Sequence, residues 1–518
     1  MKKILDFLYN KRYYFYSLLV AFLILLFTSK NSFLYKLNDW VDANAFFTVG
    51  KSMMNGVVPY KDLFEQKGLI LYVIYGIGYL LCHKAFYGVF ILEVISFSVF
   101  LYYAHKIFSL YLNKKYSFIL IPVLAYLITT SRAFVHGGSC EEFSLPFFAV
   151  SLYYFFKHFK VEKLTNKEMI INGVMAGIVL MMKYTSLGLW MGFGLFIFID
   201  YIKEKDIKRA FLFCLYFLVG MLIPVLLCFI YLGINHAIKD YIECYFTFNM
   251  TTYNKASDVT LIDNIIRLIK GSLGSLRNNG KKLMLLILFI PLCVIPIKTN
   301  RDKKNNIYFK ISLVGLVLIT GIVLFWGLRF YKYYLLPIFT FLIITLLGIF
   351  IIISKLADKY IDKKYMYIVF CLILGLCTFF SYRHANYREM LNYNKSDYFQ
   401  FKYADYIAKY KDPTLLNMGF LDGGLYTTTG IIPNTKYFEV QNISYDIYPD
   451  NLDDMKYNVV NKNVKFILFY TGNDIEYVKK NFEYIFDNYE LVFDDTYIFE
   501  HTLNNAFLFK LKGLEEDK

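Results

Sequence analysis

Residues 210–233 read AFLFCLYFLVGMLIPVLLCFIYLG, an apolar stretch of 24 residues without a single charge. A helix of about 20 such residues crosses the hydrocarbon core of a bilayer. Further apolar runs lie at 13–29, 86–111, 117–131, 144–157, 168–183, 187–202, 283–297, 309–326, 333–354 and 365–381. The pattern predicts a polytopic α-helical membrane protein with about 11 transmembrane helices.

The composition agrees with a membrane chain and excludes an ordinary soluble enzyme. Of the 518 residues 57% are hydrophobic and 19% charged, against about 25% charged in soluble domains. The net charge of +15 collects between the apolar runs, in basic clusters at 2–12, 106–115, 157–167, 203–209, 298–304 and 355–364. The positive-inside rule assigns these clusters to the cytoplasm, with the N-terminus inside. The basic balance therefore sets topology, and nucleic acid is not an expected partner.

Two further segments complete the predicted organisation. Residues 69–82 (LILYVIYGIGYLLC) are too short to cross and are expected to lie along the outer membrane face. From residue 385 the chain turns acidic, with 14 basic and 21 acidic residues, a net charge of −7. There LLNMGF (415–420) and VKFILFY (464–470) predict buried strands, and 474–486 has helical spacing. We expect a membrane domain at 1–384 and a small extracytoplasmic α/β domain at 385–518.

Ionisable residues cluster in the predicted outer loops. They are Asp42, Asp62 and Lys67 in outer loop one (30–85), Glu141 and Glu142 in outer loop two (131–143), Lys183 at the outer end of its apolar run, and Arg329 and Lys332 in a third loop. Each has an ordinary structural explanation, such as a helix cap for Asp42, a capping box of Ser139 with Glu142, or interface anchors for the cations. Charged groups at membrane depth nevertheless mark functional sites, and their placement on one side favours a site.

In their order along the chain, these motifs resemble a known family. DANAFFTVGKSMMNGVVPYKD (42–62) followed by KGLI (67–70) is similar to the first outer loop of the GT-C membrane glycosyltransferases. The branch is that of the protein O-mannosyltransferases and the lipid A aminoarabinose transferase. HGGSCEEFSLPF (136–147), GVMAGIVLMMK (173–183) and RFYKYYLLP (329–337) resemble later motifs of that branch. The resemblance implies a GT-C fold with an interfacial helix at 69–82.

The sequence also departs from the family pattern. Gly68-Leu69 replaces a pair of prolines, and no arginine follows the interfacial helix, where Glu93 is the nearest ionisable residue. These departures concern the identity of the donor more than the class of reaction.

The resemblance implies inverting transfer of a sugar from a polyprenyl-phosphate donor to a lipid, glycan or protein acceptor at the outer face of the cytoplasmic membrane. Asp42 is then the expected general base. Lys67, Lys183, Arg329 and Lys332 are candidates for the donor phosphate, because the leaving group is anionic. Glu141, Glu142 and Asp62 are candidates for orienting the acceptor. Glu142 and Asp42 are also candidate ligands of a divalent cation (Mg or Mn), though this is a sparse oxygen set and metal dependence stays open.

Other functions remain open from the sequence. A flippase or transporter of lipid-linked saccharides, a polymerase or ligase of such saccharides, and a lipid-binding member without catalysis would share the same composition. A transporter needs a polar path through the bilayer centre, and runs such as ISLVGLVLITGIVLFW (311–326) carry no charge.

Overall fold

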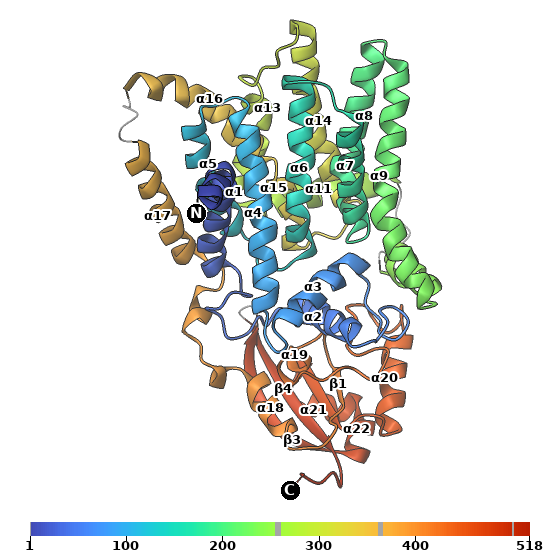
Figure 1. The fold of residues 1–518 in the computed structure, drawn as a ribbon. Helices are drawn as coiled ribbons and strands as arrows, with labels where there is room; N and C mark the ends of the chain where they lie inside the picture. The colour runs from blue at the N-terminus through green and yellow to red at the C-terminus, as the bar shows by residue number, and fades with distance from the viewer. Residues whose placement is uncertain (1, 254–260, 361–365, 500–501, 518) are drawn as a thin grey trace. The chain divides into compact units, whose positions relative to one another are not determined.

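The apolar runs fold as helices. The computed structural model describes residues 2–253, 261–360, 366–499 and 502–517 (Figure 1), so Lys363 and Lys364 of the last basic cluster lie outside the described residues. The α-helices up to residue 384 are α1 (Lys2–Thr28), α2 (Val41–Met54), α3 (Leu69–Leu81), α4 (Tyr87–Ser109), α5 (Lys114–Thr129), α6 (Cys140–Lys160), α7 (Asn166–Leu180), α8 (Gly188–Lys203), α9 (Ile207–Ile234), α10 (Ile238–Tyr241), α11 (Leu261–Ser275), α12 (Lys282–Leu288), α13 (Ile290–Cys293), α14 (Lys303–Leu324), α15 (Leu336–Phe339), α16 (Leu342–Tyr360) and α17 (Met366–His384).

The described helices include four that are long and apolar enough to cross a bilayer, Tyr87–Ser109, Tyr184–Lys203, Ile207–Ile234 and Lys303–Leu324. Lys332–Phe339 and Leu342–Lys355 pass the same test together and are bent by 44°. The chain is therefore a multi-pass membrane protein in its helix content, and the total of about 11 spans stays a prediction.

Small residues let the apolar helices approach closely. Gly173 of α7 faces α9, and a Cβ placed on it would lie 2.0 Å from the carbonyl oxygen of Phe217. Gly220 of α9 packs equally closely against α7, since a Cβ placed on it would lie 2.1 Å from the carbonyl oxygen of Ile170. Such glycine contacts are typical of helix pairs in membranes, where burial of apolar surface gives no driving force for association.

The chain folds as two compact units, each assembled from segments far apart in the sequence. The first contains Met1–Ser29, Leu92–Cys228 and Ala256–Arg388, and the second contains Lys30–Ile91, Phe229–Lys255 and Glu389–Lys518. Outer loop one, with α2 and α3, thus belongs to the same unit as the carboxy-terminal tail. The predicted limit at residue 385 did not anticipate this association of loop and tail.

The tail carries a four-stranded mixed sheet. Its strands are β1 (Leu415–Met418), β2 (Phe466–Thr471), β3 (Tyr489–Phe499) and β4 (Thr502–Leu511), in the order β1-β2-β4-β3. β1 and β2 are parallel, whereas β4 is antiparallel to both β2 and β3. The helices of the tail are α18 (Phe399–Ile407), α19 (Leu425–Thr429), α20 (Asp450–Val460), α21 (Ile475–Asn481) and α22 (Glu483–Asn488).

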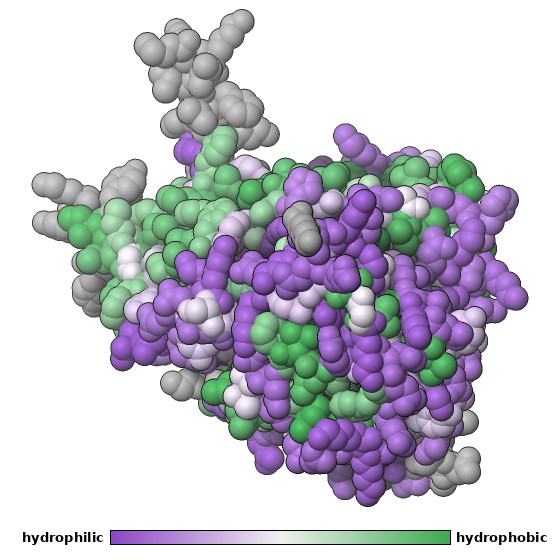
Figure 2. Space-filling model, turned by 90° about the horizontal axis from the view of Figure 1, so that it is seen from below, coloured by the Kyte–Doolittle hydropathy of each residue, from purple (hydrophilic) through white to green (hydrophobic). Residues whose placement is uncertain are grey.

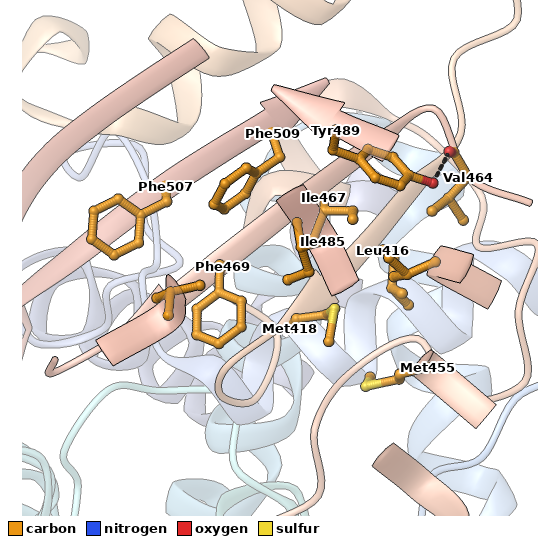
Figure 3. Close-up of a cluster of buried hydrophobic side chains, with 12 residues drawn as sticks. Leu416, Met418, Met455, Val464, Ile467, Phe469, Ile485, Tyr489, Phe507 and Phe509 are labelled. Carbon is orange, nitrogen blue, oxygen red and sulfur yellow. Dashed lines mark hydrogen bonds between the residues drawn. The ribbon is translucent and has the colours of Figure 1, made fainter. Parts of the chain in front are cut away.

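Alternate residues of the strands build a core on one face of this sheet. Leu416 and Met418 of β1 lie beside Ile467 and Phe469 of β2 and the Phe507–Phe509 segment of β4 (Figure 3). Met455, Val459, Val478 and Ile485 of the helices α20, α21 and α22 complete this cluster. On the other face Tyr403 of α18 stacks on Phe493 with 5.1 Å between the ring centroids. The predicted strands at 415–420 and 464–470 are confirmed, and the sheet is covered on both faces.

Hydrophilic residues cover much of the surface shown in Figure 2, and apolar areas lie near its centre and at its upper left. This view is from below Figure 1, the side on which α22 and β3 are labelled. A polar surface of this kind suits a domain in contact with water.

Candidate functional site

Three segments far apart in the first unit meet at Lys183. Its ammonium forms an ion pair with the Glu141 carboxylate and lies 3.1 Å from the centroid of the Tyr334 ring. Glu141 is 1% exposed and Lys183 8%. The second outer loop, the end of α7 and the third loop are thereby brought together, as the sequence analysis expected for these motifs. The Lys183 ammonium is thus a buried cation held by a carboxylate and by an aromatic ring.

Local backbone geometry sets these positions. Ser139 is the N-cap of α6 and its hydroxyl accepts a hydrogen bond from the Glu142 backbone N–H at 3.0 Å. Glu141 therefore stands in the first helical turn, where the helix dipole favours a carboxylate. Lys183 follows the end of α7 in an extended conformation, with φ −159°, and its N–H donates to the Val179 carbonyl at 2.7 Å.

Glu142 points to a different environment from that of its neighbour Glu141. Its Oε2 accepts a hydrogen bond of 2.7 Å from the Gly138 N–H, and Glu93 is its carboxyl neighbour. Ser29 donates to Glu93 Oε2 at 2.9 Å. Both carboxyl groups are buried, so Glu142 faces a carboxyl group of α4 whereas Glu141 faces Lys183.

The loop before α6 requires glycine to make this arrangement. Gly137 has a φ of +86°, and a Cβ on it would lie 2.2 Å from Ser29 Oγ and 2.7 Å from Glu93 Oε1. The predicted capping box is present only in its first half. Ser139 caps Glu142 as expected, but the Glu142 side chain bonds Gly138 in place of the Ser139 backbone.

Arg329 and Lys332 precede Tyr334 in the third loop. Arg329 is half-buried, whereas Lys332 is exposed at the start of a short helix, Lys332–Leu335. Two tyrosines of this third loop lie near Lys183, whose ammonium is 3.1 Å from the centroid of the Tyr334 ring and 5.9 Å from that of the Tyr333 ring. The sequence had indicated Lys183 as a site residue but had not indicated these two tyrosines.

Asp42 lies in the second unit, at the second position of α2. The N-cap of α2 is Trp40, so the structural role of Asp42 as N-cap is wrong. The Asp42 side chain is half-buried, in a turn where the helix N-terminus favours its charge. The Asp42 carboxylate also affects the pKa of the buried residue Glu439. Burial raises the pKa of Glu439 well above its ordinary value, and the nearby carboxylates of Asp422, Glu65 and Asp42 raise it further.

Lys67 and Asp62 also belong to this unit. The Lys67 ammonium lies 5.7 Å from the centroid of the Phe46 ring, four residues after Asp42 on α2. Its backbone N–H donates to Glu65 Oε2 and to the Tyr72 hydroxyl, both at 3.0 Å, which fixes the entry into α3. Asp62 is exposed, and its carboxylate accepts from the Val58 N–H at 2.8 Å, so it closes the turn after α2.

Buried polar contacts join α2 to the segment after β1, and sequence reasoning missed them. Thr48 donates to Asp422 Oδ2 at 2.7 Å, and Lys51 Nζ donates to the carbonyls of Tyr426 and Ile431 at 2.7 and 2.5 Å. Burial raises the pKa of Asp422 to about 6 and lowers that of Lys51 to about 7. These residues carried no local signal, because their partners lie more than 370 residues away in the chain.

The sequence names Glu142 and Asp42 as candidate ligands of a divalent cation. Among the residues that the structure describes, no three His, Cys, Asp or Glu side chains are grouped to hold a metal ion. Glu142 is engaged by Gly138 and Glu93, and Asp42 belongs to the other unit. A divalent cation held by Glu142 and Asp42 stays a prediction.

Comparison with solved structures finds the same fold. The chain aligns with ArnT from Cupriavidus metallidurans, a structure bound to undecaprenyl phosphate, with a TM-score of 0.58 and 10% identity. The alignment covers 98% of this chain and 99% of that chain. The resemblance to the branch of the lipid A aminoarabinose transferase is thereby confirmed for the fold, which is ArnT-like and helical with a small carboxy-terminal sheet.

Comparison with curated proteins finds no match. A family model does match, however, over residues 5–388. Its description is "Putative competence-induced protein Ccs4 N-terminal domain". Because the match spans most of the chain, the protein belongs to the family of the competence-induced protein Ccs4 N-terminal domain.

Proposed function

We propose that this protein transfers a hexosyl or pentosyl group from a polyprenyl-phosphate donor to a cell-envelope acceptor, at the outer face of the cytoplasmic membrane. The observation that carries the proposal is the buried Lys183–Glu141 pair under the Tyr334 ring, in a fold shared with ArnT. The ArnT structure is bound to undecaprenyl phosphate. A polyprenyl phosphate combines an apolar chain suited to the bilayer with an anionic head group suited to a buried cation.

Lys183 is proposed to bind the donor phosphate. When the bond between the anomeric carbon and the phosphate oxygen breaks, its electron pair goes to the phosphate, whose negative charge grows. A cation already desolvated among Glu141 and Tyr334 stabilises that charge more strongly than one in water, because the surrounding dielectric constant is low. Arg329, Lys332 and Lys67 are proposed as further cations for the same phosphate.

Asp42 is proposed as the general base. The acceptor hydroxyl or amine attacks the anomeric carbon and inverts it, and the Asp42 carboxylate takes the proton that the acceptor loses. Two features of Asp42 support this role. Its side chain is half-buried and so open to an acceptor, and α2 is held rigidly by Thr48 and Lys51, as a catalytic group requires.

The two glutamates are proposed to act differently. Glu141 orients the Lys183 ammonium through its ion pair. Glu142 holds outer loop two in place through Gly138 and Glu93. Asp62 is proposed to act through the turn that it closes after α2. No step of this mechanism is assigned to a metal, and Glu142 and Asp42 remain the candidate ligands of a divalent cation.

Transfer by the purified protein tests the proposal. The protein is incubated with a polyprenyl phosphate carrying a radiolabelled sugar and with a cell-envelope extract as the source of lipid, glycan and protein acceptors. The proposal expects label to move into the extract while free polyprenyl phosphate appears in equal amount. A flippase breaks no glycosidic bond, so intact donor after long incubation, with every acceptor fraction unlabelled, would refute transfer.

A further inference from the structure

A cavity of about 430 Å³ lies at one edge of the sheet in the second unit. Gly419 and Phe420 line it from the segment after β1, and Thr471 and Gly472 from the end of β2. β1 and β2 are parallel, so both of these segments leave the sheet at its carboxyl edge. This edge of a parallel pair is the usual place for a ligand in α/β sheets, and the volume suits a small molecule.

Two of the residues that line the cavity are glycines. Gly419 has a φ of +90°, and a Cβ on it would lie 2.3 Å from the carbonyl oxygen of Tyr470. Gly472 is exposed, and a Cβ there would lie 3.7 Å from Asn504 Oδ1. Glycine at 419 is thus required by the turn itself, and at 472 it leaves the Asn504 amide accessible.

An exposed aromatic ring on an anchored backbone segment lines the cavity. Phe420 is 37% exposed, although its backbone is anchored, since its carbonyl accepts hydrogen bonds from Asn417 Nδ2 at 2.9 Å and from the Val440 N–H at 3.3 Å. Behind it the Tyr470 ring lies at 60° to the Phe420 ring, with 6.4 Å between centroids. An exposed phenyl ring on a rigid backbone presents an electron-rich face to the C–H groups of a ligand.

The polar groups of the cavity are neutral. Thr471 Oγ1 accepts hydrogen bonds from Asn473 N and Nδ2, at 3.1 and 3.2 Å, so its own proton can be donated outward. Asn504 Nδ2 donates to the Thr502 carbonyl at 3.0 Å, which orients the Asn504 amide. No Asp, Glu, Lys or Arg stands among the lining residues in the part of the chain that the structure describes.

We propose that this cavity binds a neutral saccharide, with one sugar ring stacked on Phe420 and its hydroxyls bonded by Thr471 and Asn504. A sugar ring has an apolar C–H face and a rim of hydroxyls, which matches a phenyl ring bordered by hydroxyl and amide groups. The absence of charge among the described lining residues disfavours phosphates, nucleotides and cations as ligands. The inference goes beyond the proposed transfer and stands whether or not that reaction occurs.

Saturation-transfer NMR on the full-length protein in lipid nanodiscs, which contain no sugar detergent, tests the proposal. The probes are cellobiose, lactose and N,N′-diacetylchitobiose, with glucose 1-phosphate as the charged comparator. We expect transfer to the ring protons of at least one neutral disaccharide. Phe420→Ala should weaken its binding about tenfold through loss of the stacked ring. Asn504→Ala, which leaves the ring in place, should weaken it as well.

Tyr445→Ala is the matched control, because Tyr445 is an exposed aromatic residue of the same unit, 51% accessible and absent from the cavity lining. Its binding should equal that of the wild type. No transfer to any neutral disaccharide would overturn the proposal. So would binding that both cavity variants leave unchanged, or stronger binding of glucose 1-phosphate. Thermal unfolding of each variant identifies a loss caused by misfolding, and the proposal then depends on the variant that folds.

Discussion

At the scale of single residues, the protein buries a charged pair at the proposed functional site. Lys183 and Glu141 are a buried ion pair, which is costly to desolvate and costly to break. A stabilising purpose alone would be served as well by apolar residues of similar size. The retained pair therefore favours a functional role for the cation, in line with its place at the end of an apolar run.

The first prediction concerns this pair. Glu141→Gln should leave the Lys183 ammonium buried without its carboxylate and lower the free energy of unfolding by about 3–5 kcal/mol. Lys183→Met should be costly for the converse reason, whereas the double variant, neutral at both positions, should be more stable than Glu141→Gln. Thermal unfolding of the four proteins measures this. Additive losses in the double variant would show that the two side chains are not coupled.

The second prediction concerns pH. Burial raises the pKa of Asp422 from 3.8 to about 6, so the folded protein favours the protonated carboxyl. The protonated Asp422 carboxyl makes its full contribution to the free energy of unfolding below pH 4. This contribution, about 3 kcal/mol in total, is lost as the pH rises through 6. Asp422→Asn cannot titrate, so the wild type should lose stability relative to this variant between pH 4 and 7.

The melting temperatures of the two proteins, followed from pH 4 to pH 7, check the pH prediction. Asp446→Asn is the control, because Asp446 is exposed in the same unit. A constant difference between wild type and Asp422→Asn across this range would contradict the assignment.

The sequence predicted the residue types of the site better than their individual environments. Glu141 and Glu142 are adjacent and chemically alike, yet one meets Lys183 and the other meets Gly138 and Glu93. Successive residues of a helix point about 100° apart, so which carboxylate faces which neighbour depends on how the helix is rotated. Glu93 did give a signal, as the one carboxylate in the apolar run 86–111.

At the scale of elements, the apolar runs predicted where helices form but not where they break. The run at 283–297 is divided into α12 and α13, with Pro291 in the first turn of α13, where its missing N–H is tolerated. The predicted helix at 474–486 is also two helices. α21 ends at Asn481, and the ring of the next residue, Phe482, packs on Phe469 of β2 with 4.8 Å between centroids. Tertiary packing of one aromatic ring overrides the helical spacing.

The third prediction concerns the crossing of α2 and α3, which lie side by side in Figure 1. A Cβ on Gly50 would lie 2.6 Å from the Gly76 nitrogen and 2.8 Å from the Tyr72 carbonyl oxygen. Backbone atoms cannot rotate away, so Gly50→Ala should force the helices apart and cost about 1–3 kcal/mol. Gly194→Ala, on α8 with open space around it, is the matched control. Equal unfolding temperatures for both variants would contradict this packing.

At the scale of the whole molecule, composition predicted the division into apolar helices and a mixed α/β tail. It did not predict that the tail forms one unit with outer loop one. Thr48 and Asp422 stand 374 positions apart, and nothing in either local sequence indicates the other. A hydropathy pattern describes one segment of the chain at a time. It therefore cannot predict which distant segments contact each other in the folded protein.

The fourth prediction concerns topology. The positive-inside rule orients the N-terminus to the cytoplasm and the tail to the outside. Protease added to right-side-out cells should therefore release the tail as a fragment beginning near residue 385, detected by an antibody against it. Inverted vesicles should protect the tail. Protection in cells with cleavage in inverted vesicles would reverse the orientation and contradict transfer at the outer face.

The central claim, sugar transfer with Asp42 as general base, is tested most directly by the rate of polyprenyl phosphate release in Asp42→Asn. The account predicts that release from a radiolabelled polyprenyl-phosphate sugar falls by at least about 100-fold, as expected on loss of a general base, with membrane insertion intact. Asp450→Asn, which alters a first-turn carboxylate of α20 in the same unit, should release it at the wild-type rate. Near-normal release by Asp42→Asn would contradict the account.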